Sequence, residues 1–436
     1  MKTVSAFFAA ELDRPQHRMT HSGNAHQGIL CAMMCAMPTE HPTLSATFEA
    51  SLSPNGIAAT YTRAPFQAWS AAAQGVARFW SSAIDQGETP LDVVDTAYRW
   101  MQSAFERKPP TWSTPHQVVR EWPIARLRDF GVSSRSDVVP VLVLPPQAGH
   151  DSCIADFASG QSQIETIRNV GLGRVASLDW IGATYDTKDT TVEDYLAVIA
   201  DAIQMLGGRV NLVGDCQGGW LGTIYAALHP ETVHTLTIAG APIDTRYGTP
   251  QLQEWFGIIS PTRSTAAHRM LVAMHAGILP GRYQLAGFKA MEPAGEFERL
   301  ALLLGNAQDK DDLAHYAKFA DWFEHTQDIS GAFYLWIVEH LFARNELAAG
   351  TLRVAEGRVD LKRIQCPIYM IAGDRDHITP AEQVWSLERY VSTDPKDMTR
   401  RLASAGHLGL FMGRHALQDH WTPALTDILQ RSLLPN

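Results

Sequence analysis

The most informative stretch of this chain is Val210–Trp220, which reads VNLVGDCQGGW. Its first four residues form a short apolar run typical of a buried strand, and a helical pattern follows the glycines. A sharp turn between the two holds Cys216 in a strained conformation, so Gly214 and Gly218, two residues away on either side, must be small. The pattern therefore predicts a strand, a tight turn that presents a nucleophilic cysteine, and a helix. The alternative is a buried cysteine beside a glycine turn.

Two groups favour the thiolate of such a cysteine, namely the N-terminus of the following helix and a nearby histidine. When a nucleophile lies on a turn of this kind, its acid and its base follow later in the chain, in that order. The segment 367–380 begins as a strand and opens into a polar loop that holds Asp374 and Asp376. We predict Asp376 as the acid and assign Asp374 to hydrogen bonds within the loop.

The general base predicted from this order is His407, which follows the last expected strand. His377 is a weaker candidate because it adjoins Asp376, and adjacent side chains of an extended segment point apart. The backbone N–H groups of Gln217 and Ala148 are the predicted oxyanion hole. His150, in the same loop as Ala148, is expected to orient that loop or to contact the substrate.

Together these roles predict acyl transfer through a covalent intermediate. Cys216 is deprotonated by His407 and attacks an ester or thioester carbonyl, while Asp376 holds the imidazole in the required tautomer. The acyl group then passes from the cysteine to water or to an alcohol. The motif alone leaves both acceptors open.

The wider chain alternates strands and helices, which predicts a mostly parallel α/β sheet. Expected strands are 117–119, 126–130, 138–144, 174–180, 210–213, 235–239, 367–372 and 400–403. Expected helices are 60–107, 190–205, 218–229, 380–390 and 415–433, with Thr190 and Glu193 as a capping box. Between about 247 and 350 only helical signals occur, so this segment is predicted to be a helical cap inserted in one domain. Its aromatic side chains suit an apolar acyl-binding cleft, although most of them would serve simple packing equally well.

The first 55 residues are expected to form a poorly ordered segment, with 56–436 as the catalytic domain. An alternative is that Met37 is the true initiator. His17 with His21, and Cys31 with Cys35, lie in this segment, and their spacing fits no metal site known to us. We therefore predict neither a metal nor any other cofactor.

Composition excludes some classes of partner. The chain has 436 residues, with 36 Lys and Arg against 46 Asp and Glu, and a net charge of −10 argues against nucleic acid. No apolar run approaches the ~18 residues that a membrane helix needs, so an integral membrane protein is not expected. Five cysteines are too few for a disulfide scaffold, which favours a cytoplasmic protein.

At this point the sequence resembles a known superfamily. The motif GDCQGG at 214–219, with Asp376-His377-Ile378 and Gly406-His407, is similar to the polyhydroxyalkanoate synthases and intracellular polyhydroxyalkanoate depolymerases. These enzymes are α/β-hydrolase-like and use cysteine where lipases use serine. The resemblance covers about residues 60–425. It implies an α/β-hydrolase fold with Cys216, Asp376 and His407 as the triad.

Within that superfamily, some motifs of this chain resemble the synthases and others resemble the depolymerases. The Gly-x-Cys-x-Gly-Gly box and Asp-His-Ile look like a synthase. The stretches QAGH at 147–150, GAPID at 240–244, AGFKAM at 286–291 and GHLGLFMGR at 406–414 look more like the depolymerases. Ala381 also stands where synthases usually carry tryptophan.

The resemblance implies a thiol-type hydrolase that cleaves polyhydroxyalkanoate esters through an acyl-Cys intermediate. The alternative is a polyhydroxyalkanoate synthase that polymerises 3-hydroxyacyl-CoA at the same cysteine. A second alternative is a non-catalytic granule-associated protein. The implied partners are a polyester or hydroxyacyl-CoA substrate and the granule surface, and a homodimer is left open.

Overall fold

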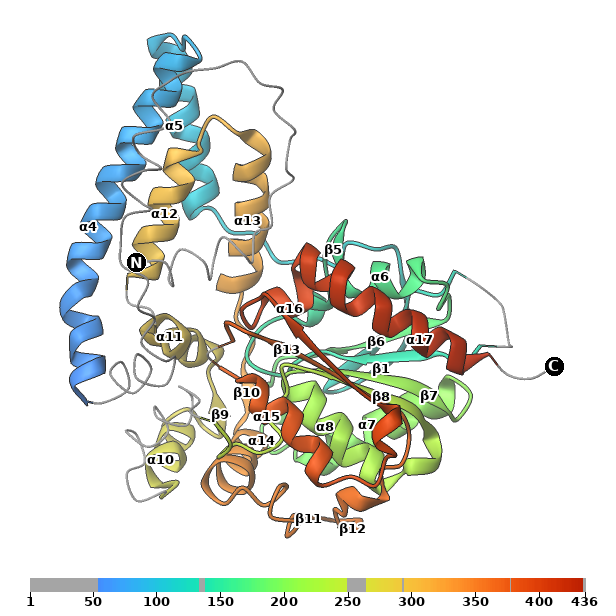
Figure 1. The fold of residues 1–436 in the computed structure, drawn as a ribbon. Coiled ribbons are helices and arrows are strands. Elements are labelled where there is room, and N and C mark those ends of the chain that lie inside the picture. The colour runs from blue at the N-terminus through green and yellow to red at the C-terminus, as the bar shows by residue number, and fades with distance from the viewer. Residues whose placement is uncertain (1–53, 133–137, 249–263, 292–293, 377, 434–436) are drawn as a thin grey trace, which may run out of the picture.

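Eight strands form one sheet through the middle of the molecule (Figure 1). The computed structural model describes residues 54–132, 138–248, 264–291, 294–376 and 378–433, with side chains from residue 61 onward. The strands of this sheet are β1 (Gln117–Trp122), β2 (Ala125–Asp129), β3 (Val141–Leu144), β6 (Val175–Trp180), β7 (Val210–Asp215), β8 (Val233–Ala239), β13 (Ile368–Gly373) and β14 (Met398–Ala403).

The strand order is β1-β2-β6-β3-β7-β8-β13-β14. Strand β2 runs antiparallel to both of its neighbours, and all other pairs are parallel. This arrangement is the mostly parallel sheet that the alternating sequence pattern predicts. With β7 followed by a sharp turn into a helix, it is an α/β-hydrolase fold.

Helices cover both faces of the sheet (Figure 1), as the double burial of its central strands requires. Leu142, Leu144 and Leu212 face one core, whereas Val141, Val143 and Val213 face the other. The helices on the first face are α7 (Val192–Met205), α8 (Gln217–Leu228) and α15 (Ala381–Trp385). Those on the second face are α6 (Gln163–Asn169), α16 (Gly409–Met412) and α17 (Thr422–Ser432).

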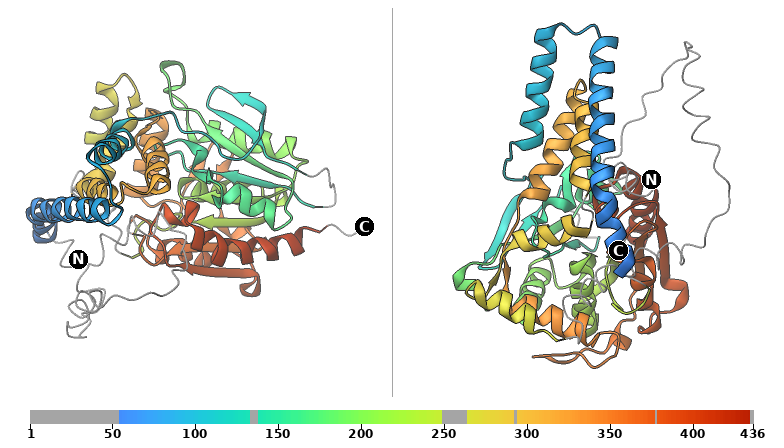
Figure 2. Two further views of the ribbon diagram at one scale, coloured as in Figure 1. Left: turned by 90° about the horizontal axis from the view of Figure 1, so that it is seen from above. Right: turned by 90° about the vertical axis from the view of Figure 1, so that its left-hand side faces the viewer.

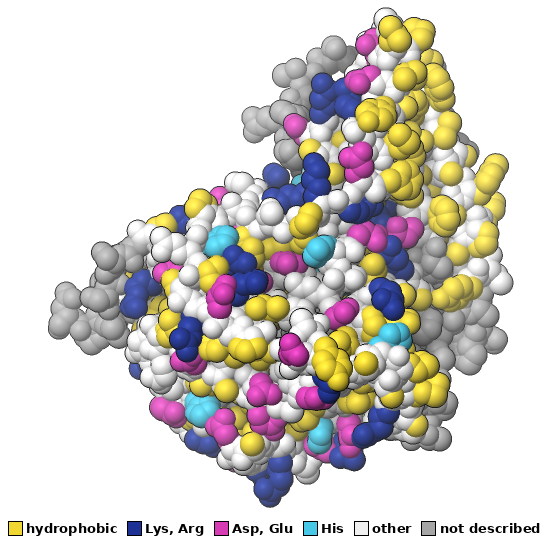
Figure 3. All heavy atoms as spheres, turned by 180° about the vertical axis from the view of Figure 1, so that it is seen from behind, with side chains coloured by type: hydrophobic (Ala, Val, Ile, Leu, Met, Phe, Trp, Pro, Cys, Tyr) yellow, Lys and Arg dark blue, Asp and Glu magenta, His cyan; other side chains and the backbone are white. Residues whose placement is uncertain are grey.

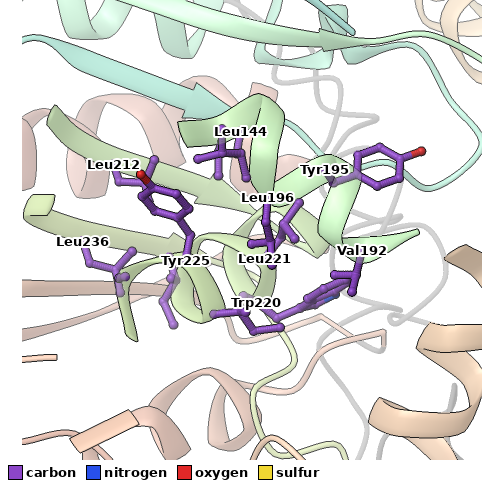
Figure 4. Close-up of a cluster of buried hydrophobic side chains, with 14 of the residues drawn as sticks. Leu144, Val192, Tyr195, Leu196, Leu212, Trp220, Leu221, Tyr225 and Leu236 are labelled. Carbon is purple, nitrogen blue, oxygen red and sulfur yellow. The ribbon is translucent and has the colours of Figure 1, made fainter. Parts of the chain in front are cut away.

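Aromatic packing joins the first core to the segment between β8 and β13. Trp220 of α8 and Tyr195 of α7 belong to the buried cluster of Figure 4. Phe333 packs against both, with its ring centroid 4.2 Å from that of Tyr195 and 6.1 Å from that of Trp220. The segment that carries Phe333 is therefore anchored on the sheet's own helices.

Helices dominate that segment, as the sequence pattern predicts. They are α10 (Ala266–Met274), α11 (Gly281–Met291), α12 (Gly295–Gly305), α13 (Lys310–Glu324) and α14 (Gly331–Trp336), followed by a π-helical turn, Ile337–Ala343. Three small two-stranded sheets were not expected: β4 (Asp156–Ala158) with β5 (Gln161–Ser162), β9 (Ile278–Leu279) with β10 (Ile329–Ser330), and β11 (Arg353–Val354) with β12 (Gly357–Arg358).

Two N-terminal helices, α4 (Pro54–Asp85) and α5 (Pro90–Phe105), form a lobe that stands away from the sheet (Figures 1 and 2). They run in opposite directions and pack on α12 and α13. Contact between α4 and α12 is very close, because a Cβ at Gly75 would lie 2.3 Å from the Ala301 carbonyl oxygen. The segment 1–55 expected at the N-terminus lies almost wholly outside the described residues. No helix in the described part of the chain is long and apolar enough to cross a membrane.

The capping box of α7 lies one residue later than expected. Thr191 donates its backbone N–H and its hydroxyl to Asp194 Oδ2, at 2.7 and 3.1 Å. Glu193, the expected partner of Thr190, instead accepts the backbone N–H of Ala355 at 3.2 Å. The Glu193 carboxylate, which the local sequence pattern assigned to the cap of α7, thus makes a tertiary contact with Ala355 instead.

A buried polar network ties the central strands to the C-terminal helix. The Asn211 side-chain amide donates to the Val139 carbonyl (3.0 Å) and to Ser432 Oγ (2.8 Å). Thr235 on β8 donates its hydroxyl to Asn211 Oδ1 at 2.9 Å. Two residues along β8, the equally buried Thr237 hydroxyl has no hydrogen-bond partner among the described residues.

These two threonines predict opposite effects of the same substitution. Thr235→Val removes the donor of a buried acceptor and is expected to lower the free energy of unfolding by about 1–3 kcal/mol. Thr237→Val removes an unpaired buried hydroxyl and is expected to raise it by roughly 1 kcal/mol. Urea unfolding of both variants measures the difference, and equal destabilisation by the two would contradict the prediction.

Candidate active site

Cys216 occupies the tight turn between β7 and α8. Its backbone has φ 48° and ψ −111°, a left-handed conformation that is strained for a residue with a Cβ. The neighbouring strand holds it there, because the Cys216 N–H donates to the Ala239 carbonyl of β8 at 2.8 Å. The half-buried thiol therefore lies at the carboxyl end of the central strands.

The glycines around Cys216 are required by the close approach of three backbones. A Cβ at Gly218 would lie 1.9 Å from the Leu144 carbonyl oxygen at the end of β3. A Cβ at Gly214 would lie 2.5 Å from the Gly218 carbonyl oxygen. The small neighbours predicted from the sequence thus have a steric cause in the structure.

Asp376 and His407 come together from the loops after β13 and β14. His407 Nδ1 donates to Asp376 Oδ2 at 2.7 Å, and both side chains are buried. The other oxygen of Asp376 accepts the backbone N–H groups of Ile378 (2.9 Å) and Thr379 (2.8 Å). The carboxylate is therefore held by three donors and orients the imidazole.

His407 also hydrogen-bonds with the Cys216 side chain. Burial acts to lower the pKa of His407, but the charges of Asp376 and Cys216 outweigh it and raise that pKa well above its usual range. These interactions favour the imidazolium form of His407. The structure thus brings together all three residues predicted as the triad.

The rejected acid candidate lies elsewhere. Asp374 is more exposed and accepts the Ser404 hydroxyl at 2.9 Å, while its backbone N–H donates to the Ala403 carbonyl at 2.9 Å. Asp374 therefore links the loops after β13 and β14. It was expected to hold its own loop through backbone N–H groups, but Asp376 accepts those donors instead. His377, the competing base, lies outside the described residues.

The predicted oxyanion donors lie on two neighbouring loops. Gln217 is the first residue of α8, directly after Cys216. Ala148 belongs to the loop after β3, and this loop starts beside the cysteine turn because Leu144 pairs with Gly214. Gln147, buried in the same loop, donates from its amide to the Tyr195 hydroxyl at 3.4 Å. The loop of Ala148 therefore starts next to the turn that carries Cys216.

His150 is buried among aromatic rings of the segment between β8 and β13. Its ring stacks on Trp322 and Phe323, with centroids 5.0 and 5.5 Å away, and contacts the Phe323 carbonyl at 3.1 Å. Burial lowers the pKa of His150 to about 4, so the ring is neutral at pH 7. This environment suits a residue that orients its loop.

Asp215 is a buried ionisable group that sequence reasoning did not single out. It ends β7 next to the cysteine, and Gln163 donates its amide to Asp215 Oδ1 at 2.9 Å. Burial raises the pKa of Asp215 to about 7, while the charge of His407 acts in the opposite direction. The available signal in the sequence was a carboxylate at the end of a strand that is buried along its whole length.

Other cysteines and metal ligands do not compete for this site. Burial raises the pKa of Cys366 to about 12 and that of Cys153 well above its usual value, so both remain thiols at neutral pH. Within the described ranges, no group of three or more His, Cys, Asp or Glu side chains is arranged to hold a metal ion.

Comparison with known proteins adds independent information. A family model described as "Protein of unknown function (DUF3141)" matches residues 124–426. The poly(3-hydroxyalkanoate) polymerase subunit PhaC of Haloferax mediterranei is 27% identical over 371 residues, which are 82% of this chain and 69% of that protein. The PhaC subunit of Synechocystis is 23% identical, covering 65% of this chain and 77% of its own.

Among solved structures, an epoxide hydrolase of Bacillus megaterium aligns with a TM-score of 0.45 and 14% sequence identity. The alignment covers 72% of this chain and all of that one.

The site predicts selective alkylation of Cys216. At pH 7, iodoacetamide should modify this cysteine much faster than Cys153 or Cys366, because the thiolate is the reactive form. Asp376→Asn removes a charge that raises the pKa of His407, so the imidazolium and its thiolate partner become less populated. The rate at Cys216, followed by peptide mass spectrometry, should fall about tenfold or more. An unchanged rate in this variant would contradict the assigned contacts.

Proposed function

Since the chain belongs to the DUF3141 family, within the polyhydroxyalkanoate synthase-like α/β-hydrolase superfamily, we propose that it is an acyltransferase that polymerises 3-hydroxyacyl thioesters at Cys216. The observation that carries the proposal is the hydrogen-bonded series Cys216–His407–Asp376. From the sequence we expected hydrolysis first and polymerisation second. The names of the relatives favour the second.

The chemistry of a cysteine nucleophile supports the same choice. When Cys216 takes an acyl group from a CoA thioester, one thioester replaces another, so the step is close to balanced in energy. Taking the acyl group from an ester would instead produce a thioester of higher energy. A thiol is thus better matched to a thioester donor than to an ester.

The first half-reaction transfers the acyl group to the enzyme. The Cys216 thiolate attacks the thioester carbonyl, and the N–H groups of Gln217 and Ala148 are proposed to bind the oxyanion. The tetrahedral intermediate collapses, its C–S bond to CoA breaks, and His407 gives its proton to the departing CoA thiolate. Asp376 keeps the imidazole oriented throughout.

The second half-reaction extends the polymer. His407 accepts the proton of a chain-end hydroxyl, whose oxygen attacks the acyl-Cys carbonyl and forms the new ester. The C–S bond breaks and the Cys216 thiolate returns beside the imidazolium.

We propose that the segment of about 247–350 acts as the cap of this site. Its described part contacts the loop of Ala148 directly, because Gln327 donates its N–H to the Gly149 carbonyl at 2.8 Å. A Cβ at Gly149 would also lie 3.2 Å from the Gln284 side chain of α11. The segment thus contacts the loop whose Ala148 N–H is proposed to bind the oxyanion. Trp255 and Phe256, expected in the acyl cleft, lie outside the described residues.

The proposal predicts the fate of a 3-hydroxybutyryl-CoA substrate. Free CoA should appear together with an equivalent amount of ester-linked hydroxybutyrate, quantified by a thiol assay and by chromatography after methanolysis. Cys216→Ala should lower turnover by at least three orders of magnitude, because it removes the nucleophile. Cys366→Ala is the matched control and should retain full activity.

Two outcomes would contradict the proposal. Release of CoA with free hydroxybutyrate and no polymer would identify a hydrolase. Absence of turnover in the wild-type chain, with both CoA ester and preformed polyester, would favour the non-catalytic granule protein.

A further inference from the structure

The helix α4 carries a row of exposed apolar side chains along its length. They recur at alternating intervals of three and four residues, the spacing of a helix that packs on another helix in a coiled coil. The row consists of Phe66, Trp69, Ala73, Val76 and Trp80, with Ile84 at its end. Trp69 is 72% exposed. This row is separate from the face that binds α12, which includes Ala64, Gly75, Phe79 and Ala83.

The helix α5 repeats the pattern. Its exposed row consists of Leu91, Val94, Tyr98, Met101 and Phe105, again at alternating intervals of three and four. Leu91 is 81% exposed. Thr96 and Ala104, by contrast, are buried against the neighbouring helices. Each helix thus buries one apolar face within the chain and leaves a second apolar face exposed.

The exposed surface is larger than an isolated chain normally presents. Figure 3 shows apolar side chains gathered over this lobe. The large side chains of the two rows are each 46–81% exposed, and with 150–250 Å² for each aromatic residue they present roughly 1,000 Å² in total. The largest apolar patch of a typical monomer is only about 300–600 Å². A stable interface uses about 800 Å² from each partner.

The charged side chains of the two helices are engaged elsewhere. Arg78 of α4 lies on the side of α12, because a Cβ at Gly305 would lie 3.2 Å from its Cβ. Asp95 of α5 pairs with Arg99 of the same helix at 2.7 Å, and Asp92 belongs to the capping box of α5. The rows themselves consist of apolar residues alone.

We infer that the α4–α5 lobe is the interface between two copies of this chain, which pair through these rows as a bundle of helices. The second copy is favoured by area, because the exposed rows present about what each partner contributes to a stable interface, and their spacing is that of helices that pack on helices. The inference is independent of the proposed acyltransferase activity.

The test is the mass of the full chain in solution, measured by sedimentation and by light scattering. The wild type should have twice the monomer mass of 48.1 kDa. Val76→Glu combined with Val94→Glu places a charge in the middle of each row and should produce the monomer. Both positions are exposed within one chain, so the thermal unfolding of the monomer should be retained. Tyr185→Glu with Met205→Glu, at exposed apolar positions outside the lobe, is the control and should remain dimeric.

Hydrogen exchange provides the second measurement. Deuterium uptake over residues 61–105 should decrease as wild-type concentration rises, and should be independent of concentration in the Val76→Glu, Val94→Glu variant. A monomeric wild type would overturn the inference, whether the rows then bind polyester particles or are covered by residues 1–53. A variant that stays dimeric would overturn it as well.

Discussion

The close approach of the Cys216 turn to the ends of β3 and β8 is the constraint on which the site depends. There is no space for a Cβ between Gly218 and the Leu144 carbonyl, so the helix α8 starts immediately beside the strand. That proximity places the loop of Ala148 next to the thiol. It also strains the cysteine, and the hydrogen bond to Ala239 compensates for part of that strain.

Electrostatic interactions around His407 are the second feature on which the site depends. Asp376 accepts hydrogen bonds from two backbone N–H groups and from His407 Nδ1, so the imidazole has one favoured orientation. Burial alone would lower the pKa of His407, but the charges of Asp376 and Cys216 outweigh burial and raise that pKa. The site therefore favours a protonated His407 next to Cys216. Asp215 adds a second carboxyl group directly before Cys216 in the chain, in a position where burial favours the protonated form.

The sheet and the contacts of the triad could be predicted because each rests on local patterns: apolar runs, glycines at fixed spacing, and polar residues at strand ends. Features set by tertiary contacts could not. Glu193 accepts a backbone N–H that is distant in sequence instead of capping α7, and the strands of the small two-stranded sheets are too short to show a period. The helical pattern over 60–107 is confirmed by α4 and α5, although a turn at 86–89 divides it into two helices. The period does not reveal which face of each helix the chain itself buries.

The most direct test of the central claim is the mass of the Cys216 peptide after one turnover with 3-hydroxybutyryl-CoA, quenched in acid. We expect one hydroxybutyryl group on Cys216 and none on Cys153 or Cys366. His407→Gln should slow formation of this adduct strongly, because the base that generates the thiolate is gone. Turnover without an adduct on Cys216, or with an adduct on another residue, would contradict the mechanism.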